Sequence, residues 1–271
     1  MPDTDRVLID EVDDDILTVT LNRPDTRNAL SASLIQDLHQ TFEAIAYDRT
    51  TRVVILTGAG KGFCSGADTV GDGSSAPGAD GTGPTVTAFA YQEFLAALHE
   101  RMTRSRKPII AAVNGAAVGG GFSLSLACDI RFAAESARFG AIFITKGVSA
   151  CDMGTSYFLP RLVGASRSME LMLTGRIFDA AEALDMGLVL DVVPDGQVVD
   201  RALETARLIR ANAPLATWMT KETMWQSIDA PSLRHALDLE NRTQIMCSGT
   251  GEIREAFQAF NEGRTPSWRG L

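Results

Sequence analysis

The chain has 271 residues, of which 45% are hydrophobic and 22% charged, the composition of an ordinary globular protein that can bury one large core. Its formal net charge of −9 argues against nucleic acid as a partner, because nucleic-acid-binding proteins present a basic face. The four cysteines are widely separated and form no C-x-x-C pair, so we expect free thiols, no metal site and a cytoplasmic location. We find no signal-peptide pattern and no apolar run of membrane-spanning length, so no membrane partner is expected.

The N-terminal part predicts a hairpin, a helix and a buried strand. Val7–Val12 and Ile16–Leu21 lie on either side of an acidic turn and alternate as the two strands of a hairpin do. Ser31 is the expected N-cap of a helix whose apolar residues recur at helical spacing over Leu34–Ile45. The short apolar run Val53–Leu56 then predicts a buried strand.

A glycine-rich loop, T-G-A-G-K-G-F-C-S-G-A-D, follows this strand from Thr57 to Asp68. It is not a P-loop, because Lys61 is followed by Gly62 where a P-loop has Ser or Thr. It is not a dinucleotide-binding fingerprint either, because Phe63 occupies the position of the last glycine. The spacing also excludes the G-x-S-x-G elbow of serine hydrolases. Nucleotide-phosphate chemistry is therefore not expected.

The chain is organised around a second glycine-rich stretch, Lys107–Ala133. Its apolar run Ile109–Val113 predicts a strand, Phe122–Cys128 a buried helix, and the segment from Ile130 the next strand. The consecutive glycines Gly119–Gly121 lie at the entrance to the helix. Such glycines leave the first helical amides open to an oxygen that gains negative charge, and they equally permit tight packing of strand against helix. This stretch alone leaves both interpretations open.

The two glycine-rich stretches share a plan. V-I-L-T-G-A and A-A-V-N-G-A each pass from a buried strand through a polar residue to a glycine and an alanine. Two such strands, parallel and adjacent, would bring both amide-rich loops to one edge of a sheet, where α/β proteins bind ligands. We therefore expect a repeated strand–turn unit with a ligand site at that edge.

A polar segment and two titratable side chains complete the middle of the chain. Thr69–Thr87 is rich in Gly, Ser, Pro, Asp and Thr and is expected to be a surface loop. His99, on the apolar side of the helix expected over Ala88–Arg104, is interpreted as a partly buried structural histidine. Asp152 has apolar neighbours, which raise the pKa of a carboxyl group and suit it to proton transfer near neutral pH. It also precedes a helical segment, so an N-cap is an equally good interpretation.

The remainder of the chain is mainly helical. One helix is expected to end at Gly175, another to begin with Asp179 as its N-cap, and Leu188–Val193 predicts a last strand. Four amphipathic helices are expected over Val198–Asn212, Leu215–Ser227, Leu233–Cys247 and Glu252–Phe260. We therefore divide the chain into a core, residues 1–195, and a C-terminal helical region, residues 196–271.

Several motifs occur together in a fixed order. They are N-R-P-D-T-R-N-A-L (Asn22–Leu30), G-K-G-F-C-S-G-A-D (Gly60–Asp68), K-P-I-I-A-A-V-N-G-A-A-V-G-G-G (Lys107–Gly121), A-C-D-I-R-F-A, L-T-G-R-I-F-D-A-A-E-A-L-D-M-G-L-V (Leu173–Val189) and F-N-E-G-R-T-P. In these motifs the chain resembles the crotonase, or enoyl-CoA hydratase/isomerase, superfamily over nearly its whole length. The resemblance implies an α/β fold, a spiral of ββα units, with a C-terminal helical region that forms trimers, often paired into hexamers. It also implies an acyl-CoA thioester as substrate; coenzyme A is part of that thioester, so no separate cofactor is implied.

The resemblance assigns site residues by motif position. The backbone amides of Ser65 and Gly120 match the oxyanion hole of the family, which holds the thioester oxygen as it gains charge. The positions that match the coenzyme A channel are Arg27, Ala29, Ala67 and Asp68, and the C-terminal positions that approach coenzyme A, often that of a neighbouring subunit, are Phe260 and Arg264.

The sequence departs from the family pattern in the acid–base residues. Family hydratases carry two glutamates, and Ser123 and Phe143 occupy those positions here. Efficient hydration is therefore in doubt, because water has to be activated and a proton delivered to Cα. Asp152 lies at or next to the position of the single carboxylate of enoyl-CoA isomerases, in a context also similar to dienoyl-CoA isomerases and to the nucleophilic Asp of 4-chlorobenzoyl-CoA dehalogenases.

These comparisons favour a double-bond isomerase in which Asp152 moves a proton from Cα to Cγ while the oxyanion hole holds the enolate oxygen. A hydratase that uses Asp152 and a water held by Ser123 stays an alternative, as does an acyl-CoA binder without catalysis. Dehalogenation is disfavoured, because no histidine occupies the matching helix position and His99 lies about one turn away.

Overall fold

The computed structural model describes residues 4–13, 15–73, 77 and 83–270. Strands among these residues form a larger and a smaller sheet. The larger sheet has the spatial order β1 (Val7–Glu11), β2 (Ile16–Leu21), β3 (Val53–Gly58), β5 (Ile109–Val113), β7 (Ile130–Ala134), β10 (Val192–Val193). The smaller sheet has the order β4 (Gly62–Cys64), β6 (Ala116–Val118), β8 (Arg138–Gly140), β9 (Phe178–Asp179).

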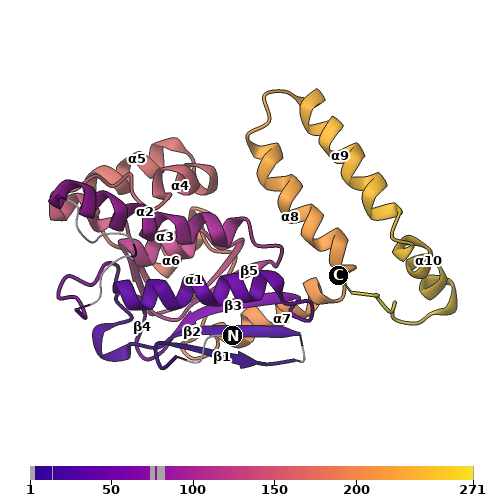
Figure 1. Ribbon diagram of the computed structural model, residues 1–271, viewed down its shortest axis with the longest axis horizontal. Coiled ribbons are helices and arrows are strands. Elements are labelled where there is room, and N and C mark those ends of the chain that lie inside the picture. Colours follow the sequence, from indigo (N-terminus) through magenta and orange to yellow (C-terminus); the bar gives the residue numbers. More distant parts are fainter. Residues whose placement is uncertain (1–3, 14, 74–76, 78–82, 271) are drawn as a thin grey trace.

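Helices connect the strands and make up the C-terminal part (Figure 1). Their bounds are α1 (Ala32–Tyr47), α2 (Pro84–Thr103), α3 (Gly120–Leu126), α4 (Thr155–Val163), α5 (Ala165–Thr174), α6 (Ala180–Asp185), α7 (Val198–Arg210), α8 (Pro214–Ile228), α9 (Leu233–Ser248) and α10 (Glu252–Glu262), with the 3-10 helices η1 (Pro24–Thr26) and η2 (Ile142–Lys146).

The chain alternates between the two sheets. It passes from β3 to β4, from β5 to β6 and from β7 to β8, and helices α2 and α3 return it from the smaller sheet to the larger. Both series are parallel: β3 pairs with β5 and β5 with β7, while β4 pairs with β6 and β6 with β8. The repeated strand–turn unit is therefore confirmed, and so is the α/β spiral of ββα units. The parallel pairing brings the ends of β3 and β5, with the glycine-rich loops that follow them, to one edge.

Side chains alternate along each strand of the larger sheet, so its inner strands bury one row of side chains on each face. Val54 and Leu56 of β3 belong to the main core, which also contains buried side chains of α1, α2 and α3. Val53 and Ile55 point to a second core, which α7 completes with residues such as Ala202. The two cores together hold β3 and β5 in place at the point where their loops begin.

Near the site, two elements start earlier than the sequence predicts. α2 begins at Pro84, inside the segment Thr69–Thr87 that was expected to be a loop; a proline fits the first turn of a helix because it has no N–H, and N–H groups at that position make no bond within the helix. Residues 74–76 and 78–82 of that loop prediction lie outside the described residues. α3 begins at Gly120, with Gly119 (φ +55°) as its N-cap, so Gly120 and Gly121 belong to the helix itself.

The predicted strand Leu188–Val193 is wrong in length, since only β10 at its end is a strand. The hairpin, the Ser31 cap, the Asp179 cap and the C-terminal helices agree with the prediction to within a few residues. In the described part of the chain, no helix combines the length and the apolar character that crossing a bilayer requires.

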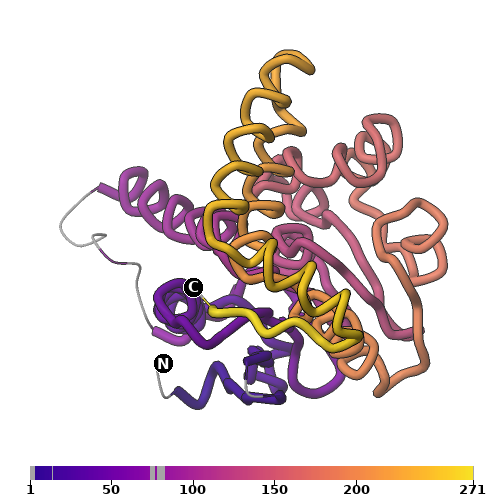
Figure 2. The backbone as a smooth tube through the Cα atoms, turned by 90° about the vertical axis from the view of Figure 1, so that its right-hand side faces the viewer, coloured from indigo at the N-terminus to yellow at the C-terminus, as the bar shows by residue number. Residues whose placement is uncertain are grey.

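The C-terminal helices extend away from the sheets. α8, α9 and α10 project to the right of the body in Figure 1, and α9 reaches beyond it again in the rotated view of Figure 2. The expected division at residue 195 stays a prediction; α7, which that division places in the helical region, packs on the larger sheet.

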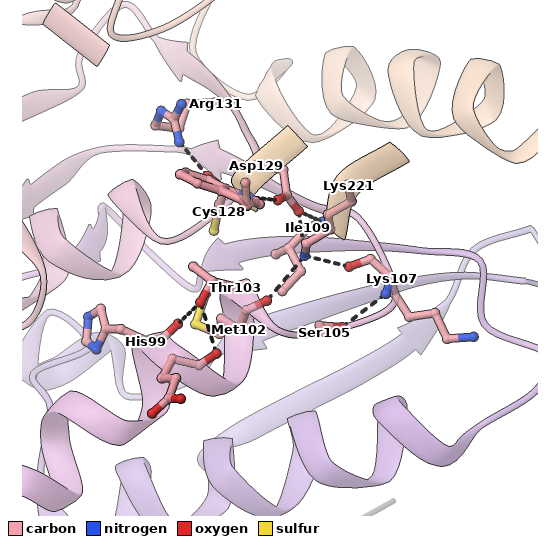
Figure 3. A network of polar contacts seen from close by, with 12 residues as sticks. His99, Met102, Thr103, Ser105, Lys107, Ile109, Cys128, Asp129, Arg131 and Lys221 are labelled. Carbon is pink, nitrogen blue, oxygen red and sulfur yellow. Dashed lines mark hydrogen bonds and ion pairs between the residues drawn. The ribbon is translucent and has the colours of Figure 1, made fainter. Parts of the chain in front are cut away.

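A buried ion pair joins α8 to the central strand β5 (Figure 3). Lys221 Nζ lies 2.8 Å from Asp129 Oδ2 and donates to the carbonyls of Met102 and Lys107 at 3.2 and 3.0 Å. The same carboxylate oxygen accepts from Ile109 N at 2.7 Å, at the first residue of β5. A buried ammonium group needs such partners, and this set anchors the start of the helical region to the strand that leads into the site.

Candidate active site

The two glycine-rich loops are in direct backbone contact. A Cβ on Gly121 would lie only 2.1 Å from the carbonyl oxygen of Cys64. A Cβ on Gly66 would lie 2.9 Å from Val118 O and 3.2 Å from Gly120 N. The tight packing that the sequence left open is thus present, and it brings the amide of Gly120 beside the first loop.

Asn28 fixes the shape of the first loop. Its side-chain nitrogen donates to the carbonyls of Ala59, Gly62 and Phe63 at 3.0, 2.8 and 3.1 Å, and its oxygen accepts from Arg23 N at 2.8 Å. Asn28 is fully buried and adopts a left-handed backbone conformation with φ +57°. One amide side chain therefore ties the N-R-P-D-T-R-N-A-L motif to the loop that carries G-F-C-S-G-A-D.

The structure does not leave the amide of Ser65 free for the oxyanion hole. Ser65 N donates to the carbonyl oxygen of Arg27 at 3.0 Å. An N–H group that is already bonded within the protein cannot also stabilise a developing charge at full strength. The assignment of Ser65 N to the oxyanion hole is therefore corrected; its hydrogen bond instead holds the two motifs together.

The amide of Ala67, two residues further along the chain, has different surroundings from that of Ser65. On either side of it, Leu30 N donates to Gly66 O at 2.8 Å and Asp68 N donates to Leu30 O at 3.1 Å. Successive N–H groups of an extended chain point in opposite directions, so Ala67 N faces away from that ladder. Within the part of the chain that the structure describes, neither Ala67 N nor Gly120 N has a hydrogen-bond partner. Gly120 N is also at the positive end of α3.

The segment that carries Asp152 packs against the start of α3. The next residue, Met153, has φ +47°, and its sulfur would lie 3.1 Å from a Cβ on Gly120. Burial raises the pKa of the half-exposed Asp152 carboxyl, against opposing hydrogen bonds from Met153 N–H and from the Gln92 side chain of α2. The N-cap interpretation is wrong, because Gly154 caps α4 and no side chain bonds to the helix start.

The positions of the two hydratase glutamates flank the entrance of α3. Ser123 is fully buried, and its hydroxyl lies 2.6 Å from Thr155 Oγ1 and donates to Gly119 O at 3.4 Å. Phe143 Cε1 would lie 4.0 Å from a Cβ on Gly119. An internal hydroxyl pair and an apolar ring therefore line this place, and neither position offers a group that can transfer a proton near neutral pH.

Of the coenzyme A positions, Arg27 and Asp68 have different surroundings. Arg27 is exposed and left-handed (φ 55°) at the end of η1. Asp68 Oδ2 lies 2.9 Å from the guanidinium of Arg23, which also donates to Ala29 O at 2.6 Å. Asp68 thus has a structural role in joining the two motifs, Ala29 is buried, and Arg27 remains available to a ligand.

The C-terminal positions are not brought to the site within one chain. Phe260 on α10 is 83% exposed. Arg264 is bound at 2.6 Å to each of Glu255 and Glu262, next to the same helix. α10 lies at the far end of the molecule from α4 in Figure 1.

His99 is structural, as expected. It is 3% exposed, its Nδ1 lies 3.3 Å from Leu95 O, and desolvation lowers the pKa of its imidazole to about 4. Among the described residues Nε2 has no partner. A neutral imidazole buried in this way is not the base of the site.

Sequence reasoning missed Asn28, Gln92 and the role of Ala67. Asn28 stands inside a motif, and Asn is one of the few residue types other than glycine that readily take a left-handed conformation, which is a usable signal. Ala67 N differs from Ser65 N only in its pairing: Ser65 N donates to the neighbouring segment at Arg27, whereas Ala67 N does not. Gln92 has no local signal, because its contact with Asp152 joins segments that are 60 residues apart.

Comparisons with known proteins show the family to which the chain belongs. Residues 11–270 match the family model described as enoyl-CoA hydratase/isomerase. A "probable enoyl-CoA hydratase echA12" of Mycobacterium bovis is 40% identical over 96% of this chain and 91% of its own. The "1,2-epoxyphenylacetyl-CoA isomerase" of Escherichia coli is 33% identical over 97% of this chain and 98% of its own.

Solved structures show the same fold. The crystal structure of a probable enoyl-CoA hydratase/isomerase from Mycobacterium abscessus superposes with a TM-score of 0.91 at 37% identity, covering 97% of this chain and 98% of its own. Matches of this extent, in sequence and in structure, establish common descent over the core and the C-terminal helices alike. The chain belongs to the enoyl-CoA hydratase/isomerase family, whose members act on acyl-CoA thioesters.

Proposed function

We propose that the protein is an isomerase that shifts a carbon–carbon double bond of an unsaturated fatty acyl-CoA, with Asp152 as the proton shuttle. The observation that carries this proposal is a carboxylate of raised pKa on the segment that packs against Gly120, together with the free amides of Ala67 and Gly120. One carboxylate is enough to move one proton between two carbons of the same molecule.

The reaction balances with these groups alone. The Asp152 carboxylate takes a proton from Cα of a 3-enoyl-CoA, and the electron pair of that C–H bond moves into the thioester to form an enolate. The N–H groups of Ala67 and Gly120 donate to the enolate oxygen, and one such donor contributes about 10²–10³ in rate. Asp152 then returns the proton to Cγ, and the double bond comes to lie between Cα and Cβ.

The surroundings of Asp152 suit both steps. A carbon acid is weakly acidic, so a carboxylate whose pKa is raised by burial is a better base than an exposed one. Once protonated, the same group is an acid near the enolate, so no second titrating side chain is needed. This agrees with Ser123 and Phe143 at the positions where a hydratase has its glutamates.

A hydratase is the second candidate, because relatives such as the Mycobacterium bovis protein are named as probable hydratases. It would use Asp152 and a water held by Ser123. The Ser123 hydroxyl is buried and bonded to Gly119 and Thr155, which speaks against that water site. A binder without catalysis is the third possibility, and it predicts acyl-CoA binding with no turnover.

The proposal includes a cytoplasmic homo-oligomer, either a trimer or a dimer of trimers. It is supported by the apolar side chains that α9 and α10 leave exposed, among them Ile245 and Phe257. In such an assembly Phe260 and Arg264 would approach the coenzyme A of a neighbouring subunit, and Arg27 that of its own chain.

A panel of 2-enoyl-, 3-enoyl- and dienoyl-CoA substrates tests the function with wild type, Asp152→Asn and the control Asp185→Asn, an exposed residue of α6. Wild type should convert 3-enoyl-CoA to 2-enoyl-CoA, measured by absorbance. Asp152→Asn should lose about 10²–10⁴ of that rate, and Asp185→Asn should lose nothing. Full turnover by Asp152→Asn would overturn the shuttle. Hydration alone would select the hydratase, and binding without conversion would select the non-catalytic protein.

A further inference from the structure

We propose that Gln92 is a positioning residue for Asp152, which fixes one carboxylate oxygen so that the other carries the proton. This inference rests on the proposed role of Asp152 as the shuttle. Its basis is the contact itself: Gln92 Nε2 donates to Asp152 Oδ1 from helix α2, across 60 residues of sequence.

The chemistry of the two groups fixes the direction of this hydrogen bond. An ionised carboxylate only accepts hydrogen bonds, so the amide nitrogen of Gln92 has to face it. When Asp152 takes up a proton, Oδ1 can keep accepting from Gln92 only if the proton is on Oδ2. The amide therefore stays bonded in both protonation states, and the same oxygen takes the proton from Cα and returns it to Cγ. Gln92 supplies no proton itself, because an amide does not titrate in this range.

The contact of Gln92 with Asp152 also links the first half of α2 to the rest of the molecule. The buried residues of α2 are Leu95, Leu98, His99 and Met102, all of which follow Gln92. The described residues before Gln92 on this helix are exposed or only partly buried, and the start of α2 projects from the body in Figure 2. Gln92 is thus the point at which the weakly packed half of α2 is bonded to the catalytic segment.

Charged groups on the flanking elements either bond to other residues or point away from Asp152. On α4, the Tyr157 hydroxyl donates to Asp229 and the Arg161 guanidinium lies 2.5 Å from the same carboxylate. Glu93, next to Gln92, is exposed and points about 100° away around the helix. Burial and the neutral donors Gln92 and Met153 N–H are what act on the Asp152 carboxyl.

Substitutions of Gln92 should therefore move the acid limb of the kcat/KM profile in a defined order. Activity requires ionised Asp152 and is lost as the pH falls through the pKa of that group. Gln92→Met removes a donor and should shift the limb up by about one pH unit. Gln92→Glu adds a like charge and should shift it further up, whereas Gln92→Lys adds a cation and should shift it down. Gln92→Met should also lower kcat by about tenfold with little change in KM.

Gln40→Met, the same change at an exposed position of α1, is the matched control and should leave the profile in place. Opposite shifts for Lys and Glu support the positioning role, because damage to the fold would lower activity at every pH without moving the limb. If Asp152→Asn is inactive and the Gln92 variants leave the limb unmoved, Gln92 has no such role and the proposed function stands. If Asp152→Asn keeps full turnover, the shuttle and the role of Gln92 are both wrong.

Discussion

Residues 58–68 and 114–121 pack backbone against backbone, whereas helices α9 and α10 leave most of their apolar side chains on the surface. In the glycine loops, a Cβ on Gly121 has no room at all. On α9, no residue is buried, and Ile245 is 75% exposed. The amides of Ala67 and Gly120 belong to the first region, and the positions matched to a neighbouring coenzyme A belong to the second.

The difference shows which part of the activity one chain completes by itself. The pair Ala67 and Gly120 is fixed by strand pairing and by contacts between the loops. Asp152 accepts from the side chain of Gln92 as well as from Met153 N–H, and a side-chain contact of this kind can change without altering the fold. We infer that the backbone sets the common step, enolate stabilisation, and that the side chains choose the reaction.

The strongest test of the first region is Gly121→Ala. The new Cβ would lie 2.1 Å from Cys64 O, so either β4 or the start of α3 has to move, and we expect a loss of about 3 kcal/mol or more in the free energy of unfolding. Denaturant titration measures it. Gly62→Ala is the control, because its nearest neighbour would be Ala116 O at 3.8 Å. Equal stability of the two variants would show that the loops are not in close backbone contact at Gly121.

Asn28→Ala should have the next largest effect. It removes the donor to the carbonyls of Ala59, Gly62 and Phe63 and places alanine at φ +57°. We expect a loss of about 2–3 kcal/mol in the free energy of unfolding, together with a lower kcat, since the loop carries Ala67. Asn22→Ala, which removes one exposed hydrogen bond to Asp5 O, should cost far less. A matching loss at both positions would contradict the role of Asn28 as the tie between motifs.

The repeated strand–turn unit could be predicted from local signals, because a buried strand, a polar residue and a glycine occur twice, whereas the spiral of ββα units was implied by the family resemblance. The sequence also predicted the last helices, because their caps and the spacing of their apolar residues set the bounds. It misassigned Ser65 because the choice between Ser65 N and Ala67 N depends on which amides pair with Arg27 and Leu30, a contact between distant segments. It left Asp152 open for the same reason, since Gly154, and not the carboxylate, caps α4.

A smaller effect that depends on pH is expected at Asp68. Burial would raise the pKa of its carboxyl, but hydrogen bonds from Gly71 N–H, Arg23 and Val70 N–H outweigh burial and lower that pKa. The stability that ionised Asp68 contributes is therefore full above the unfolded-state pKa of about 4. It is lost as the pH falls through the lower pKa of the folded state. Asp68→Asn should cost about 1–2 kcal/mol at pH 7, and the difference from wild type in urea titrations should shrink toward pH 3. A difference that does not vary with pH would argue against the ion pair with Arg23.

The smallest effect on stability is expected in the second region, at Phe260. Its ring is 83% exposed, so Phe260→Ser should change the free energy of unfolding of the chain by less than about 0.5 kcal/mol. If the ring contacts the coenzyme A of a neighbouring subunit, KM for an acyl-CoA should nevertheless rise about fivefold, as expected for about 1 kcal/mol of apolar contact. Tyr47→Ser, at an equally exposed aromatic residue that ends α1, should change neither quantity. An unchanged KM in Phe260→Ser would limit the site to one chain, whereas a rise in KM without loss of stability would place part of it between subunits.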